Sequence, residues 1–330
     1  MNIKYAIGII VALCLLGGGW YLASDKQNGG EKSPEVVTQN TEPALAIVTS
    51  FYPLQFAAER IVGDLGVVTN IGANVDPHNY EPSTQDIVAL EQADLVVLQG
   101  VDFEPWGDDV AEQLEANGVV VHIATENITL AESEEHEDEG DEDKEEGEEH
   151  EEEEHDSHGE FDPHTWLDPI LFSEMVKDLT VAIIAVNPKN AEVYKANATK
   201  LQTELSDLNN RYKNRLASCE LDEVITSHDA FSYVAKRYHF SVHPIAGIST
   251  QDTPSATTLA ALRKEAAEGI GAILLEENNI TAYGETLARE TGLKTLGLSS
   301  IAYAIPTGEN YLTLMQKNLD AFAVALKCDG

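Results

Sequence analysis

Short apolar runs alternate with helix-compatible segments along most of this 330-residue chain. A buried parallel strand reads as a continuous apolar run, and strands that alternate with helices predict a parallel sheet with helices on both faces. The expected strands lie at 45–49, 66–71, 93–98 and 119–123 in the first half, and at 223–226, 240–242, 272–275 and 294–298 in the second. The predicted fold class is therefore α/β, with two similar lobes, each a mainly parallel sheet flanked by helices.

Helices are expected at 52–62, 84–92, 110–116, 230–237, 257–268, 281–290 and 311–327. A further segment, Ala191 to Ala217, contains neither Gly nor Pro, and its hydrophobic residues recur every three or four positions. As one helix of about 27 residues it would extend roughly 40 Å. We expect a rigid helix that joins the two lobes; the alternative is a long helix inside a single domain.

Four parts of the chain follow from these elements. Residues 1–43 would form an N-terminal signal or anchor with a flexible tether, and 44–186 the first lobe. The linking helix would occupy 187–217, and the second lobe 218–330.

The N-terminal segment from Tyr5 to Ala23 is an uncharged run of nineteen residues. A cleaved signal has an apolar region of about 7–15 residues and a membrane span needs about 20, so the length favours an uncleaved anchor over a cleaved signal. Lipid attachment at Cys14 is not expected, because Leu rather than a small residue precedes it. The chain should lie outside the cytoplasm, anchored by residues 5–23 or released to the periplasm or cell surface after cleavage. In an oxidising compartment Cys219 and Cys328 can form a disulfide; the alternative is two unpaired thiols.

Residues 131–160 contain fifteen Glu and four Asp against one Lys, which is about half of the net charge of −38. Such a run cannot bury apolar surface and is expected to be a disordered, solvated loop. It also contains four histidines, His136, His150, His155 and His158. Imidazole together with carboxylate suits zinc, so we expect an accessory loop that captures zinc weakly; the alternative is a solubilising linker with incidental histidines. The acidic balance of the rest of the chain argues against nucleic acid as a partner and favours cations.

Three other histidines, His78, His164 and His228, lie in loops or just after expected strands, where open α/β sheets bind their ligands. Each one alone is more readily a loop or core histidine than a ligand. Together, at the rims of two facing lobes, they could occupy three corners of a tetrahedral zinc site. Asp168 and Asp229 lie close enough in sequence to hydrogen-bond ring nitrogens.

Several motifs around these histidines resemble one known family. PHNYEP at 77–82, DPHTWLDP at 162–169 after the acidic loop, and SHDAF at 227–231 are similar to motifs of cluster A-I substrate-binding proteins, which serve zinc and manganese ABC importers. The resemblance runs from about 44 to 326 and includes GISTQDTPS at 247–255 and GENYLTLMQKNL at 308–319. It implies two α/β lobes on a rigid helix, a metal ion between them, and delivery of that ion to a membrane permease.

The resemblance places the family's metal ligands on His78, His164 and His228. Zinc-type members have His at the third position, where manganese-type members more often have Glu, so His228 indicates Zn²⁺ ahead of Mn²⁺. The family often supplies an Asp in the turn after the last strand, but this turn reads Leu-Ser-Ser-Ile at 298–301. The fourth ligand would then be water, Ser299 reached indirectly, or Glu276, whose alternative role is a charge at the cleft rim.

The predicted function is extracytoplasmic, high-affinity zinc binding by a monomer that delivers Zn²⁺ to an ABC transporter permease. Three alternatives remain: a manganese-type binding protein, a surface metal buffer or adhesin, and a zinc-dependent enzyme, because three His and a water also form catalytic zinc sites. An enzyme is disfavoured because the sequence has no nucleophile elbow, HExxH motif or phosphate-binding loop.

Overall fold

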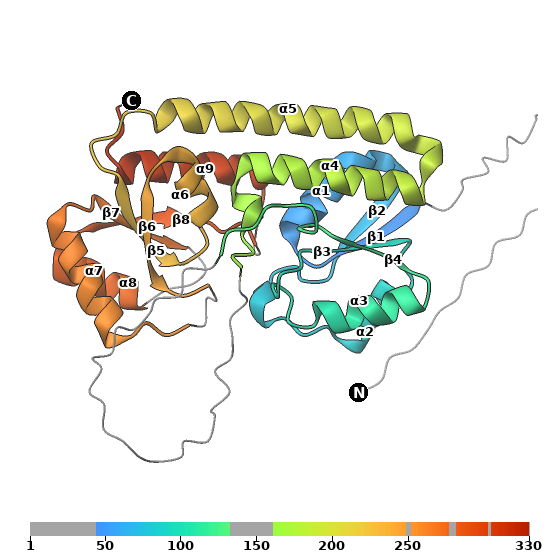
Figure 1. Ribbon diagram of the computed structural model, residues 1–330, viewed down its shortest axis with the longest axis horizontal. Helices are drawn as coiled ribbons and strands as arrows, with labels where there is room; N and C mark the ends of the chain where they lie inside the picture. Colours follow the sequence, from blue (N-terminus) through green and yellow to red (C-terminus); the bar gives the residue numbers. More distant parts are fainter. Residues whose placement is uncertain (1–43, 133–160, 249–251, 277–281, 303–304, 330) are drawn as a thin grey trace, which may run out of the picture. The chain divides into compact units, whose positions relative to one another are not determined.

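The computed structural model describes residues 44–132, 161–248, 252–276, 282–302 and 305–329. These residues confirm the predicted α/β fold with two lobes (Figure 1). The expected anchor and tether at 1–43 and nearly all of the acidic loop, residues 133–160, lie outside the described residues. Within the described ranges, no helix has the length and apolar character needed to cross a membrane.

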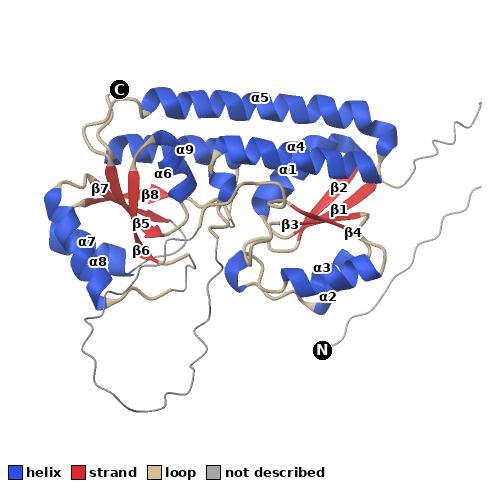
Figure 2. Ribbon diagram, viewed as in Figure 1, coloured by secondary structure: helices blue, strands red, loops and turns tan. Residues whose placement is uncertain are grey.

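The first lobe is built on a parallel sheet of β1 (Leu45–Thr49), β2 (Gly66–Asn70), β3 (Leu95–Leu98) and β4 (Val120–Ile123), in the order β2-β1-β3-β4. Helix α1 (Tyr52–Val62) covers one face, and α2 (Thr84–Glu91) and α3 (Gly107–Ala116) cover the other (Figure 2). Alternate residues of β3 therefore enter different cores: Leu95 and Val97 pack with α1, whereas Val96 and Leu98 pack beneath α2 and α3. This two-sided burial explains why the strand is apolar throughout.

The second lobe repeats this topology. Its parallel strands are β5 (Glu223–His228), β6 (Ser241–Ala246), β7 (Ala272–Glu276) and β8 (Lys294–Leu298), in the order β6-β5-β7-β8. Its helices are α6 (Ser232–Tyr238), α7 (Ala256–Glu268), α8 (Ala282–Thr291) and α9 (Tyr311–Ala325). In both sheets the first strand of the lobe pairs with the second on one side and the third on the other. That arrangement makes the carboxyl end of the first strand the switch point, where such sheets bind ligands.

Two long helices, α4 (Pro169–Val186) and α5 (Ala191–Arg215), pack against each other. Helix α5 corresponds to the expected linking helix but ends two residues earlier, and it contacts α1 in the first lobe and α9 in the second (Figure 1). Its buried side chains, from Tyr194 to Tyr212, belong to a hydrophobic core that includes residues of both lobes. It therefore does more than span the lobes, because it is packed into both of them along its length.

Helix α4 was not among the expected elements. It begins at Pro169, and the Asp168 side chain accepts hydrogen bonds from the backbone N–H groups of Ile170 and Leu171. A capping Asp followed by Pro at the first helical position is a strong start signal. Short 3₁₀ helices complete the described elements: η1 (Gly63–Leu65), η2 (Pro77–Asn79), η3 (Thr165–Leu167) and η4 (Pro188–Asn190).

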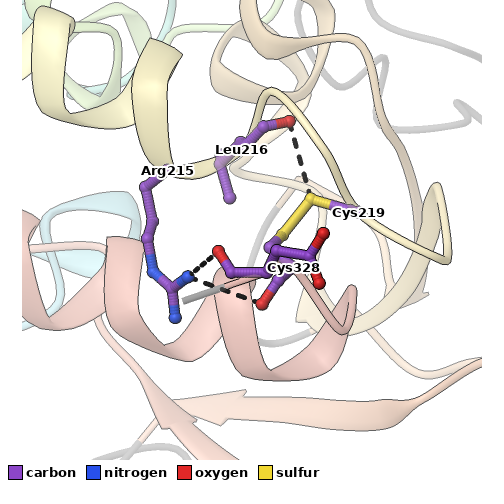
Figure 3. The surroundings of a disulfide bond; sticks show 5 residues. Arg215, Leu216, Cys219 and Cys328 are labelled. Carbon is purple, nitrogen blue, oxygen red and sulfur yellow. Dashed lines mark hydrogen bonds between the residues drawn. A yellow bond between two sulfur atoms is a disulfide. The ribbon is translucent and has the colours of Figure 1, made fainter.

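Cys219 and Cys328 are joined by a disulfide (Figure 3). The bond connects the segment that follows α5 to the residues that follow α9, and the two cysteines also form an antiparallel backbone bridge. The guanidinium of Arg215 donates to the backbone oxygens of Cys328 and Asp329, which holds the same junction from the end of α5. The C-terminal end of the described chain is thereby fixed to the start of the second lobe.

Candidate metal site

The structure brings together the three histidines that the sequence singled out. His78 lies in η2 of the first lobe, His164 lies immediately before η3, and His228 is the last residue of β5 in the second lobe. The ring centroids of His78 and His164 are 5.4 Å apart, and those of His164 and His228 are also 5.4 Å apart. His164 is thus the middle member of a group to which both lobes contribute.

His164 is buried, and its ring is held by a carboxylate. Asp162 Oδ1 lies 2.8 Å from His164 Nδ1 and also accepts a hydrogen bond of 2.9 Å from the His164 backbone N–H. Because an ionised carboxylate only accepts hydrogen bonds, this contact favours the tautomer with the proton on Nδ1. The other ring nitrogen, Nε2, is buried without a hydrogen-bond partner. A buried lone pair of this kind is costly unless a ligand uses it.

His228 has a similar neighbour in Glu276, at the end of the adjacent strand β7. The Nδ1 and Oε2 atoms are 3.2 Å apart and both side chains are buried, although the two groups are not aligned for a hydrogen bond. Glu276 Oε1 accepts a hydrogen bond of 2.8 Å from the backbone N–H of Ser300. Burial opposes the charged imidazole, but Glu276, helped by Asp76 and Asp229, raises the pKa of His228 above its ordinary value. Burial likewise opposes the Glu276 carboxylate, and the facing His228 together with Ser300 lowers the pKa of Glu276.

His78 is half-buried, unlike the other two histidines. Its ring packs edge-on against Phe103, with centroids 4.7 Å apart. Asp76 caps η2 by accepting a hydrogen bond of 3.1 Å from the His78 backbone N–H. The same Asp-Pro-His arrangement occurs at Asp162–His164, so two of the three histidines follow a proline and an Asp that accepts their backbone N–H.

Aromatic side chains surround the histidine group. Phe103 also lies near His164, and Trp166 lies 5.1 Å from His164 between ring centroids. The Trp166 indole donates a hydrogen bond of 2.7 Å to the backbone oxygen of Ser300 in the second lobe. These contacts exclude water around His164 and lower the local dielectric, which strengthens charge interactions at the site.

The remaining sequence candidates fall in different places. Glu276 lies beside the group as described, whereas the Ser299 hydroxyl accepts the backbone N–H of Ile301 within its own turn. Asp168, which we expected to orient a histidine ring, instead caps α4 and pairs with Arg237 of α6. The role expected of it belongs to Asp162, which sequence reasoning missed. The accessory histidines His136, His150, His155 and His158 lie outside the described residues.

The three histidines lie close together, but they do not form a complete metal coordination shell. Among the residues that the structure describes, no three His, Cys, Asp or Glu side chains have the arrangement needed to hold a metal ion. The donor set that is present, imidazole nitrogens in a largely dry setting, suits zinc better than the harder ions.

Known proteins share both this sequence and this fold. A family model described as zinc-uptake complex component A, periplasmic, matches residues 47–325. The high-affinity zinc uptake system protein ZnuA of Bacillus subtilis is 35% identical over 303 residues, which cover 90% of this chain and 92% of that protein. The zinc-binding protein AdcA of Streptococcus pyogenes serotype M6 is 31% identical over 88% of this chain, which spans only 57% of the length of AdcA.

Solved structures agree with these matches. The Zn(II)-bound ZnuA-like domain of Streptococcus pneumoniae AdcA is 30% identical and has a TM-score of 0.70, covering 86% of this chain and 99% of that one. The match of sequence and fold over nearly the whole described chain confirms the resemblance inferred from the histidine motifs. The chain belongs to the zinc-uptake complex component A family.

Proposed function

We propose that this protein is the high-affinity zinc-binding component of an ABC importer, and that it carries Zn²⁺ outside the cytoplasm to a membrane permease. One observation supports this most directly: three imidazoles from separate segments of both lobes lie within 5.4 Å of their neighbours, measured between ring centroids. The family match supports the transport role, since the matched family is a component of zinc uptake. Zinc is the cargo of such a protein, and no chemical step is required of it.

His78, His164 and His228 are the proposed ligands. The carboxylates of Asp162 and Glu276 each lie against an Nδ1 atom, which supports Nε2 as the metal-binding nitrogen of His164 and His228. Three neutral nitrogen donors favour zinc over manganese, which prefers oxygen ligands. Glu276 is then an orienting neighbour of His228, and a water molecule is the proposed fourth ligand.

The test is a zinc titration of the full chain in competition with a chromophoric chelator, comparing wild type with His164→Ala. We expect one tight zinc per wild-type chain and loss of that site in the variant, with any weak binding by the acidic loop left in place. His243→Ala is the matched control. Like His164, His243 contacts carboxylates, here those of Glu223 and Glu265, but it is partly exposed and lies on β6. Tight one-to-one binding that survives both His164→Ala and His78→Ala would refute the proposal.

A further inference from the structure

Asp162 occupies the point where the chain returns from the acidic segment. Phe161 forms an isolated antiparallel bridge with Glu132, and the Asp162 backbone N–H donates a hydrogen bond of 3.0 Å to the Ala131 oxygen. We call residues 131–132 and 161–162 the neck. Asp162 is only 3% exposed, so its carboxylate is a buried charge that must be satisfied by the groups around it.

The second lobe holds this neck through the first two residues of α6. The Ser232 hydroxyl donates to Asp162 Oδ2. The Tyr233 hydroxyl donates a hydrogen bond of 2.7 Å to the Asp162 backbone oxygen and accepts one of 3.0 Å from the Ala131 backbone N–H. The Tyr233 hydroxyl thereby connects both segments of the neck to α6. Burial raises the pKa of Tyr233 to about 12, so the hydroxyl stays neutral and keeps both its donor and its acceptor role.

The Asp162 carboxylate also contacts the histidine group. While Oδ2 takes the hydrogen bond from Ser232, Oδ1 takes the two from the backbone and ring of His164. Each Asp162 oxygen therefore has its own partner, one in the first lobe and one in the second. A displacement of α6 or of the neck would have to move Asp162, and with it the hydrogen bond that orients His164.

We propose that Asp162 is the positioning residue for His164 and that Ser232 and Tyr233 hold it from the second lobe. Zinc at His164 and a closed neck then stabilise each other. This inference rests on the proposed function, because it requires His164 to bind the metal. By linkage the coupling acts in both directions: a closed neck strengthens zinc binding, and bound zinc protects the neck from opening.

The experiment compares three variants of the full chain, Asp162→Ala, Ser232→Ala and Tyr233→Phe, in the chelator competition assay. Loss of a partner that orients a metal ligand typically costs about 10–100-fold in affinity, which is the range expected for Asp162→Ala. Tyr233→Phe and Ser232→Ala should cost less, about 3–10-fold, because they act through Asp162. Asp162→Asn should recover part of the loss, since an amide oxygen can still accept from Nδ1.

The control is Tyr238→Phe, in the same helix. Tyr238 is also buried, and its hydroxyl donates a hydrogen bond of 3.2 Å to Asn209, away from the neck. Both tyrosine variants should lower the stability of the metal-free protein, but only Tyr233→Phe should weaken zinc binding. Nitrogen-15 NMR of the metal-free protein should show the His164 proton on Nδ1 in wild type and a tautomer mixture in Asp162→Ala. Hydrogen exchange at 131–132 and 161–164 should slow on adding zinc to wild type, and less so in Tyr233→Phe.

Wild-type zinc affinity in both Asp162→Ala and Tyr233→Phe would overturn the inference, as would equal losses in Tyr233→Phe and Tyr238→Phe. His164→Ala separates this failure from a failure of the proposed function. If that variant loses the tight site while Asp162→Ala keeps it, only the positioning role is wrong. If His164→Ala itself keeps the site, the ligand assignment fails first.

Discussion

Glu276→Gln tests whether a buried carboxylate supports the metal site without being a ligand. The amide keeps the size and shape of the side chain, and its oxygen can still accept the hydrogen bond from Ser300. What it removes is the negative charge 3.2 Å from His228 Nδ1. We expect zinc affinity to fall by about 10–100-fold, with one site per chain retained.

In the metal-free protein, two opposing terms act on the pair of protonated His228 and Glu276. Two unit charges 3.2 Å apart attract by about 5 kcal/mol at an effective dielectric constant of about 20. Removing both groups from water offsets much of this attraction. Burial is the largest single influence on His228, and it takes Glu276, Asp76 and Asp229 together to raise the pKa of that ring. This pair exists only while His228 is protonated; once zinc binds the neutral ring, Glu276 acts instead on the charge of the bound ion through that ring. Loss of such an orienting carboxylate is expected to cost about 10–100-fold, equivalent to about 1.4–2.7 kcal/mol.

The loss should depend on pH, which separates it from a general structural effect. In wild type, zinc displaces a proton that Glu276 helps to hold on His228, because metal binding requires the neutral ring. In the variant, burial remains while the opposing charge is gone, so the pKa of His228 falls and less proton competition remains. The difference in zinc affinity should therefore be largest near pH 8 and shrink below about pH 6.5.

Glu265→Gln is the matched control. Glu265 Oε2 also lies 3.2 Å from a histidine Nδ1, that of His243, but this pair is partly exposed and His243 lies on β6, outside the histidine group. Exposed ion pairs contribute little, so zinc affinity should not change. Unchanged affinity in Glu276→Gln at all pH values, or equal losses in the two variants, would refute the reasoning. Complete loss of the one-to-one site would instead make Glu276 a direct ligand.

Two further predictions concern stability. Cys328→Ser should lower the free energy of unfolding, measured in urea, by about 2–5 kcal/mol, because the disulfide joins residues 109 positions apart. A reductant should lower the stability of wild type but not that of the variant. Equal effects of the reductant on both proteins would contradict a formed disulfide. In metal-free protein, the raised pKa of His228 contributes stability below its unfolded value of 6.5, and the lowered pKa of Glu276 contributes stability above 4.5. The difference in the free energy of unfolding between wild type and His228→Gln should therefore be largest at about pH 5.5 and smallest at about pH 8. A larger difference at pH 8 than at pH 5.5 would exclude the ion pair.

Strands such as β1 and β3 were predicted well because their burial is two-sided. The bounds of β1 are the expected ones, and β3 starts two residues later than expected. The bounds of β8 and β4 were also predicted to within a residue, although most of their residues are exposed or half-buried. Helix α4 was missed because apolar residues lie on both of its faces. Its buried residues keep helical spacing, from Phe172 through Val176 to Ile183, but its outer face also carries apolar side chains such as Val181, which is 63% exposed. Apolar residues on both faces hide the period of 3.6 from which a helix is recognised.

The grouping of the three histidines was predictable from the sequence, but the orientation of their rings was not. His228 ends a parallel strand, where open α/β sheets bind ligands, and His78 and His164 lie in loops with similar motifs. The sequence named Glu276 only as a candidate fourth ligand or a charge at the cleft rim. Its place beside His228, 48 positions away, could not be predicted, because it depends on the pairing of β5 with β7. Their juxtaposition is a property of the strand order, which a single sequence does not contain.

The partner of His164, by contrast, was within reach of local reasoning. The tripeptide Asp-Pro-His occurs at 76–78 and at 162–164, and in both copies the Asp carboxylate accepts the backbone N–H of the His two residues later. This turn is a common one for Asp, and proline in the middle fixes the backbone between the two groups. In the second copy the same oxygen also contacts the ring nitrogen Nδ1 of the buried His164. The repeat therefore predicts how the backbone of each histidine is held, and at His164 the Asp also leaves Nε2 as the ring nitrogen available to a ligand.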